Sequence, residues 1–298
     1  MKNSIIIDGN NLMYRALKVF HLSYKGKSTS MIYGVPNIIR GLITSLNASR
    51  VYVVFDGGRS IKRKEIFPTY KDRDKGDDFD FEDFKRQKEE IIKALVLLGI
   101  PVIVKKGWEA DDIIWLLTRR LKRKSNVIIV STDKDFNQLI SKKVSIWSPF
   151  KNKRITYKNV MSISGYEAYE TVDYLILDGD KSDCIPGVPG MGKVTIRKFL
   201  DENKSIRNYL ISNLPQFKKF DKKSIEEVYL LNRQLIDIRL FIRNEKASIK
   251  SLEISLKPKI KKIKTQKLNQ FIAEYDLRSF QKESFIKVFK RLNYEDIN

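Results

Sequence analysis

Cysteine and histidine are almost absent from this chain of 298 residues, which holds one of each, Cys184 and His21. A structural zinc site takes four ligands of these two kinds, so such a site is excluded, and a single cysteine excludes an intrachain disulfide. A Ser-His-Asp triad would have to use His21, and no neighbouring residue supports that role. The chemistry must therefore depend on other side chains.

Long apolar runs are missing as well. No run approaches the ~18 residues that a membrane-spanning helix needs. The N-terminal stretch reaches Asp8 too early for a signal peptide, so we expect no membrane association and a cytoplasmic location. Hydrophobic residues make up 42% and charged residues 32%, as in globular rather than disordered chains.

Negative charge is scarce: 36 acidic residues stand against 58 basic ones, for a net charge of +22. A balance this basic indicates a polyanionic partner, most often nucleic acid, although a solvated lysine-rich surface is the alternative. The acids are more informative than the bases, because many of them directly follow apolar segments.

Four short, β-branched apolar runs predict strands buried on both faces, and acids follow each of them. The runs and their acids are 4–7 with Asp8, 51–55 with Asp56, 100–104 with Glu109, and 126–130 with Asp133 and Asp135. Helical periodicity lies between them, over 33–46, 81–98 and 111–121. This alternation predicts a parallel α/β sheet, in which ligands bind beyond the carboxyl ends of the strands.

The character of the chain changes near residue 165, after which helices dominate. They are expected over 166–177, 195–201, 224–235, 265–275 and 279–292, with a glycine turn from Gly187 to Gly192 and a basic segment at 257–264. We therefore divide the chain into an α/β domain, 1–165, and a mainly helical region, 166–298. The charged segment 59–80 follows the second strand and should hang over the same sheet edge.

Nine acids are expected at or beside the strand ends: Asp8, Asp56, Glu109, Asp111, Asp112, Asp133, Asp135, Asp180 and Asp183. Taken singly, each is an ordinary cap or turn residue. Together they would repel strongly, by about 4 kcal/mol for two charges 4 Å apart at an effective dielectric of 20, so we expect bound cations. Oxygen ligands favour Mg²⁺ or Mn²⁺, and two such ions can activate water and stabilise the leaving oxygen of a phosphodiester.

Several motifs carry a family resemblance. They are Asp8-Gly9-Asn10-Asn11, Phe55-Asp56-Gly57, Tyr70-Lys71, Glu109-Ala110-Asp111-Asp112, Ser131-Thr132-Asp133-Lys134-Asp135, Gly179-Asp180-Lys181-Ser182-Asp183 and the turn ending at Gly192. On these motifs, from Ile5 to about Ile242, the chain resembles the flap endonuclease and 5′-nuclease family. That family includes the 5′-nuclease domain of bacterial DNA polymerase I and stand-alone phage enzymes of the 5′-exonuclease and ribonuclease H types.

The resemblance implies a PIN-like sheet, a helical arch at about 59–97 and a helix-three-turn-helix motif at the glycine turn. It implies that two or more Mg²⁺ ions, replaceable by Mn²⁺, bind the nine acids, and that K⁺ binds the glycine turn. The first ion would be held or oriented by Asp8, Asp56, Glu109, Asp111 and Asp112. The second would be held by Asp133, Asp135, Asp180 and Asp183, with Asp111 between the two. Catalytic roles would belong to Lys71, Asp111 and Asp133, and Lys71 would offset charge on the scissile phosphate.

DNA contacts are implied at Tyr70, Lys71, Arg73, Gly187, Gly190, Gly192 and Lys193. Tyr70 would stack on a base or pack under the arch. Three positions depart from the family pattern. Arg73 follows Lys71 more closely than the usual second arch cation, Cys184 stands where the family often has Asn, and Val194 stands where it has Lys, which Lys193 can replace. These departures concern binding more than cleavage.

The function expected is hydrolysis of DNA near a 5′ end or a single-strand/duplex junction, leaving 5′-phosphate and 3′-hydroxyl ends. RNA primers in RNA–DNA hybrids are further expected substrates, and a monomer working with replication proteins in trans is expected, in the host cytoplasm if phage-encoded. Three alternatives stay open: a non-catalytic branched-DNA-binding protein of the same fold, a PIN-type ribonuclease, and a phosphatase of another α/β family. The nuclease hypothesis requires Asp8, Glu109, Asp133 and Asp183 to lie within shared coordination range.

Overall fold

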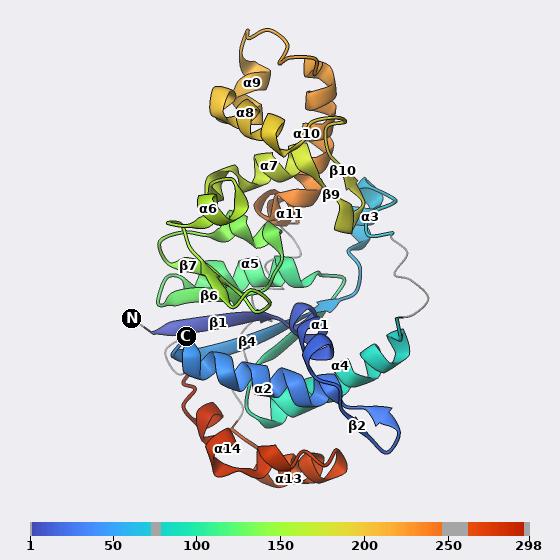
Figure 1. Ribbon diagram of the computed structural model, residues 1–298, viewed down its shortest axis with the longest axis vertical. Helices are drawn as coiled ribbons and strands as arrows, with labels where there is room; N and C mark the ends of the chain where they lie inside the picture. The colour runs from blue at the N-terminus through green and yellow to red at the C-terminus, as the bar shows by residue number, and fades with distance from the viewer. Residues whose placement is uncertain (1, 73–78, 246–261, 295–298) are drawn as a thin grey trace.

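A twisted six-stranded sheet forms the centre of the computed structural model, which describes residues 2–72, 79–245 and 262–294 (Figure 1). The strand order is β5-β4-β1-β6-β7-β8, with all neighbours parallel except β7 and β8, which are antiparallel. The strands are β1 (Asn3–Asp8), β4 (Ala48–Gly57), β5 (Val102–Lys106), β6 (Asn126–Val130), β7 (Val144–Ser148) and β8 (Lys153–Ile155). The first four confirm the predicted strands. Strands β7 and β8 were not predicted. Strand β8, at the edge of the sheet, has no apolar run and pairs only with β7.

Helices cover both faces of the sheet, as predicted (Figure 1). They are α1 (Gly9–Val19), α2 (Ser30–Ser45) and α4 (Phe81–Leu97) on one face and α5 (Ala110–Leu121) on the other. A short hairpin, β2 (Ser23–Tyr24) and β3 (Lys27–Ser28), lies between α1 and α2. The predicted arch contains α3 (Ile61–Ile66) and α4. The buried stripe of α4, which includes Ile91 and Leu95, belongs to the core rather than to a free arch.

The parallel register brings the carboxyl ends of the strands to one edge. Ile7 of β1 pairs with Val53 of β4 and with Val130 of β6. Asp8, at the end of β1, therefore lies between the segments that follow β4 and β6. This edge carries the candidate site.

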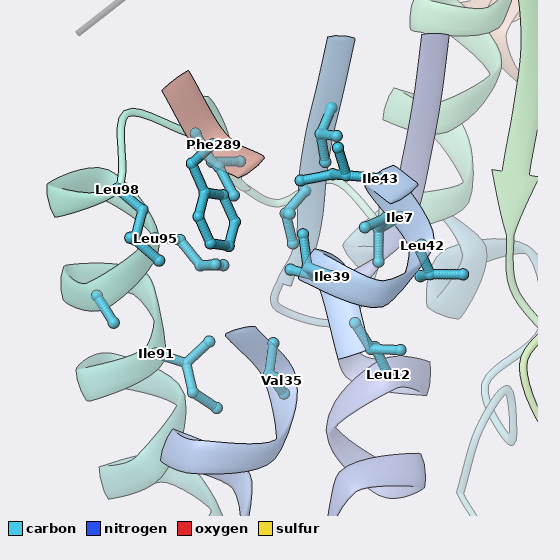
Figure 2. Packing of buried hydrophobic residues seen from close by; sticks show 14 of the residues in the cluster. Ile7, Leu12, Val35, Ile39, Leu42, Ile43, Ile91, Leu95, Leu98 and Phe289 are labelled. Carbon is cyan, nitrogen blue, oxygen red and sulfur yellow. The ribbon is translucent and has the colours of Figure 1, made fainter. Parts of the chain in front are cut away.

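The C-terminal helices return to the first core. They are α13 (Thr265–Glu274), the 3-10 turn η4 (Arg278–Gln281) and α14 (Glu283–Lys290). Figure 2 shows Phe289 of α14 close to Leu95 and Leu98 of α4 and facing Ile39 of α2. Although the sequence assigned 166–298 to one helical region, this last part therefore packs on the α/β domain, because the aromatic face of α14 needs an apolar partner. The boundary at residue 165 stays a prediction.

A second body with its own apolar core lies on the α5 side of the sheet (Figure 1). It is built from α7 (Thr171–Asp178), β9 (Gly179–Asp180), η3 (Lys181–Asp183), β10 (Ile185–Pro186), α8 (Lys193–Asn203), α9 (Ile206–Ile211) and α10 (Lys222–Ile236). The buried side chains of η1 (Lys134–Leu139), α6 (Val160–Ser164) and α11 (Ile238–Asn244) pack instead in the core that contains α5, and η2 (Ala168–Glu170) leads into α7. Among all the described helices, none combines the length and apolar character needed to cross a bilayer.

Candidate active site

Asp8 and Asp133 are held in place as helix caps. Asp8 ends β1 and caps α1, with Oδ1 accepting a hydrogen bond from the Asn11 amide at 3.1 Å. Its Oδ2 accepts from the Ser131 hydroxyl at 3.0 Å. Asp133 follows β6 and caps η1, accepting from the Asp135 amide at 2.9 Å. Two neighbouring strands thus present carboxylates at the same edge of the sheet, as the sequence predicted.

Asp56, at the end of β4, connects two helix starts. Its Oδ1 accepts from the Ala110 amide at 2.8 Å, in the first residue of α5, and its Oδ2 accepts from the Asn10 side chain. Asn10 was not predicted as a site residue, although it belongs to the first sequence motif. These bonds fix Asp56 beside the segment that carries Glu109 and Asp111.

A buried arginine that the sequence analysis missed organises the start of α5. The Arg63 guanidinium, on α3, makes a two-pronged contact with the Asp112 carboxylate at 2.9 and 2.7 Å and contacts Glu109 Oε2 at 3.3 Å. Its carbon centre lies 3.8 Å from the ring centroid of Phe241. Asp112 has no exposed surface, and both of its carboxylate oxygens contact Arg63, so it anchors Arg63 at the start of α5. Nothing in the sequence distinguishes Arg63 from the basic residues around it.

Tyr70 and Lys71 lie against the acids from the arch side. The Tyr70 side chain is 2% exposed, and its hydroxyl is within hydrogen-bond distance of Glu109 Oε2 at 2.9 Å and Asp183 Oδ2 at 3.2 Å. Of the two roles expected for Tyr70, the structure therefore shows packing beneath the arch segment and not an exposed ring that could stack on a base. Lys71 Nζ reaches Glu109 Oε2 at 3.0 Å and Asp183 Oδ2 at 3.7 Å. The predicted projection of Lys71 into the site agrees with this geometry, and Arg73 lies outside the described residues.

Asp180 and Asp183 reach the site from the second body. Asp180 accepts from the Ser182 amide at 2.7 Å and hydroxyl at 2.6 Å, and Lys134 Nζ lies 3.6 Å from its Oδ2. Cys184, which follows, has φ of 59°, in the left-handed region that Asn tolerates well. The departure at Cys184 thus falls on a backbone position that suits the family's Asn.

The site carries more negative charge than its cations offset. Enclosure by the protein, with the charges of Asp56 and Asp133, raises the pKa of Asp8 to about 7. Enclosure likewise raises the pKa of Asp183 to about 6, and it raises the pKa of Asp135 with added repulsion from Asp133. Enclosure would also raise the pKa of Glu109, but Arg63 and Lys71 bring it below the usual value.

The acids do not form a closed metal shell. Among the described residues, no three acidic, histidine or cysteine side chains converge closely enough to hold one ion. The shared coordination range required of Asp8, Glu109, Asp133 and Asp183 is therefore not reached in this structure, so the nuclease hypothesis needs support from outside these four acids. Lys71 instead reaches Glu109 and Asp183.

The donor chemistry nevertheless fits a divalent cation. The ligating groups available are carboxylate oxygens, which Mg²⁺ and Mn²⁺ prefer. The Asp135 Oδ1 atom is buried and has no hydrogen-bond partner, so it can accept a cation. The assignment of individual metal ligands stays a prediction.

Packing explains part of the glycine content of the turn from Gly187 to Gly192. A Cβ on Gly187 would lie 2.3 Å from the Leu177 carbonyl oxygen, so only glycine fits there. Gly190 has φ of +76°, whereas a side chain on Gly192 would meet no atom within 4 Å. Lys193, the first residue of α8, is exposed. Contacts of these residues with DNA stay a prediction.

Mg²⁺ should stabilise the protein more at pH 8 than at pH 5. The folded-state pKa values of Asp8 and Asp183 are raised from 3.8 to about 7 and about 6. Protonation of these two groups therefore contributes fully to the free energy of unfolding below pH ~4, and this contribution is lost as the pH rises through 6 to 7. A bound cation replaces those protons, and at 100 times its Kd it would add about 2.7 kcal/mol. Thermal melts at both pH values, with KCl at matched ionic strength as control, measure this. Equal shifts at pH 5 and pH 8 would contradict it.

Comparison with known proteins agrees with this geometry. Residues 3–165 match the family model described as the 5′-3′ exonuclease, N-terminal resolvase-like domain. The chain is 32% identical to a 5′-3′ exonuclease of Aquifex aeolicus over the whole of both chains. It is 35% identical to the thermostable DNA polymerase I of Thermus filiformis, over 73% of this chain and 26% of the polymerase.

The fold is also that of a solved nuclease structure. A bacteriophage T5 flap endonuclease, in a complex with DNA and metal ions, superposes with a TM-score of 0.68 at 21% identity, covering 97% of this chain and 100% of the other. The predicted fold class is thereby confirmed. With residues 3–165 matched by the family model and a full-length relative at 32% identity, the chain belongs to the 5′-3′ exonuclease family.

Proposed function

We propose that this member of the 5′-3′ exonuclease family is a structure-specific 5′-nuclease that hydrolyses DNA at 5′ ends and branch points with divalent metal. One observation carries the proposal: acids that follow β1, β4, β5 and β6, and acids from η3, gather with Lys71 at the carboxyl edge of a parallel sheet. The presence of both DNA and metal ions in the related T5 complex supports it.

The residues divide into two groups around the reacting phosphate. Asp8, Asp56 and Asp111, with Glu109 beside them, would hold one ion, and Asp133, Asp135, Asp180 and Asp183 would hold the other. Bound Mg²⁺ would supply an activated water and a stabilised leaving oxygen. Asp112 acts indirectly, by holding Arg63 against Glu109.

Lys71 is placed to bind the scissile phosphate. Its ammonium group already bridges two carboxylates, and its side chain is 29% exposed, so an entering phosphate oxygen can reach it. The backbone of Lys71 has φ of 54° and its amide donates to the Asp183 carbonyl at 3.0 Å. A left-handed, non-glycine backbone is held only by such surrounding contacts, and it fixes the direction in which the lysine points.

Substrate binding would extend from the site to the exposed glycine turn. Gly190, Gly192 and Lys193 present backbone and a cation to a duplex backbone, and K⁺ would bind there. The net charge of +22 favours the polyanion at long range. We further propose that the metal is Mg²⁺ and that Mn²⁺ can replace it. RNA–DNA hybrids would also be cleaved, and the protein would act as a monomer with replication partners in trans.

The proposal is tested on an end-labelled 5′-flap and a nicked duplex, each with Mg²⁺ and with excess chelator. We expect cleavage near the junction with Mg²⁺, products carrying 5′-phosphate and 3′-hydroxyl, no cleavage in chelator, and recovery when Mg²⁺ is restored. Binding of the flap without cleavage under any metal condition would favour the non-catalytic alternative. Faster cleavage of structured RNA than of the flap would favour the ribonuclease alternative.

A further inference from the structure

A pocket of about 370 Å³ opens beside Asp133, and Lys71 does not line it. The end of β6, η1, the β7–β8 hairpin and α6 enclose it. One wall is apolar, with Ile146, Ile155 and Ile163, and another is polar, with Ser131, Thr132 and Ser164. This volume lies in the range of sites for small organic ligands, and a pocket with apolar walls and a few polar groups suits a flat, heteroatom-bearing ring.

The pocket shares a wall with the candidate active site. The Ser131 hydroxyl, in the pocket wall, donates to Asp8 Oδ2 at 3.0 Å and accepts from the Asp133 amide at 3.1 Å. Thr132, next to it, accepts from the Asn11 side chain of α1 at 2.7 Å. A group in this pocket would therefore lie within about one nucleotide of a phosphate at the acids.

Phe150 gives the pocket an aromatic rim. The ring is 37% exposed, on the turn between β7 and β8. The Arg15 guanidinium lies 5.2 Å and the Lys18 ammonium 5.5 Å from its centroid, both reaching over from α1. Lys134 and Lys151 also line the pocket. An exposed aromatic ring among cations is the combination that holds single-stranded nucleic acid, by base stacking with phosphate contacts around it.

We propose that this pocket binds one unpaired nucleobase of the strand being cut, next to the scissile phosphate, with Phe150 as its stacking surface. The inference rests on the proposed nuclease function, because the occupant is part of that substrate. Stacking tolerates any base, so the pocket selects for an unpaired nucleotide rather than for a sequence. A base inside a duplex cannot enter, and the pocket therefore favours junctions and frayed ends.

Phe150→Ala should raise KM about tenfold on a 5′-flap, in line with the loss of a base–aromatic stack, while kcat changes less than twofold. Phe150→Tyr should restore the wild-type KM. Tyr157→Ala, which removes another exposed aromatic ring outside the pocket lining, is the matched control and should leave KM unchanged. Because Phe150 is partly exposed, its variants should fold like the wild type, and thermal melts of all variants check this.

An abasic nucleotide placed in turn on each side of the scissile phosphate identifies the occupant. At one of the two positions it should weaken wild-type binding about as much as Phe150→Ala does, and the two changes together should have no further effect. Independent effects of the two changes, or an unchanged KM for Phe150→Ala, would overturn the proposal.

A 2-aminopurine placed at the same position reports on the pocket without cleavage. In chelator its fluorescence should be quenched by the wild type and not by Phe150→Ala. Failure of the nuclease function would appear as absent cleavage with quenching retained. Failure of the pocket would appear as normal cleavage with equal quenching by both proteins.

Discussion

Asp133→Asn should lower kcat for 5′-flap cleavage by about 10³-fold or more. The several kcal/mol that a catalytic metal contributes would be lost with the carboxylate that places it, and each 1.36 kcal/mol is a factor of ten. Asn caps helices as well as Asp does, so the bond from the Asp135 amide, now 2.9 Å long, should survive and the fold with it. Single-turnover cleavage at saturating enzyme measures the effect.

Asp221→Asn is the matched control, because Asp221 also caps a helix but lies exposed at the start of α10. Its cleavage rate should equal that of the wild type. Asp183→Asn should lower activity as much as Asp133→Asn does, since it also removes a proposed metal ligand. Asp183 belongs to the second body of the protein. Asp133→Asn activity within tenfold of wild type would exclude Asp133 as a metal ligand.

Arg63→Met should lower the free energy of unfolding by about 3–5 kcal/mol. The substitution leaves the Asp112 carboxylate, which has no exposed surface, without its two-pronged partner, and removing one member of a buried ion pair has an effect of this size. The free energy of unfolding is measured by urea denaturation. The double variant Arg63→Met/Asp112→Leu should recover much of the loss, because a buried pair replaced by apolar side chains is often neutral.

Arg278→Met is the control for losing an arginine that contacts an aspartate. The Arg278 side chain is 83% exposed and contacts Asp276 at 2.9 Å, where solvent screens the interaction, so its denaturation midpoint should stay at the wild-type value. If Arg63→Met shifted the midpoint no more than Arg278→Met, the buried pair would not stabilise the fold. Arg63→Met should also reduce cleavage, because Glu109 loses a contact that fixes it.

Local sequence determined the four parallel strands β1, β4, β5 and β6, most helices and the edge at which the acids lie. An apolar β-branched run followed by an acid is a local pattern, and parallel pairing of β1, β4, β5 and β6 carries it to one edge without further information. The positions of Asp8, Asp56 and Asp133 followed from that rule. The same rule placed the segment 59–80 over this edge, whereas the position of Lys71 in the site was implied by the family resemblance.

Tertiary packing alone decided which side chains meet across the site. Arg63, one of many basic residues in its segment, is selected because its helix lies against α5, where burial demands a partner for Asp112. Tyr70 is buried by the second core rather than left free for a base. The antiparallel pairing of β8 creates the Phe150 pocket, and the aromatic face of α14 brings the C-terminus back to the first core. The apolar periodicity of a helix or strand is a property of its own segment. Which side chains it contacts depends on segments that are distant in sequence.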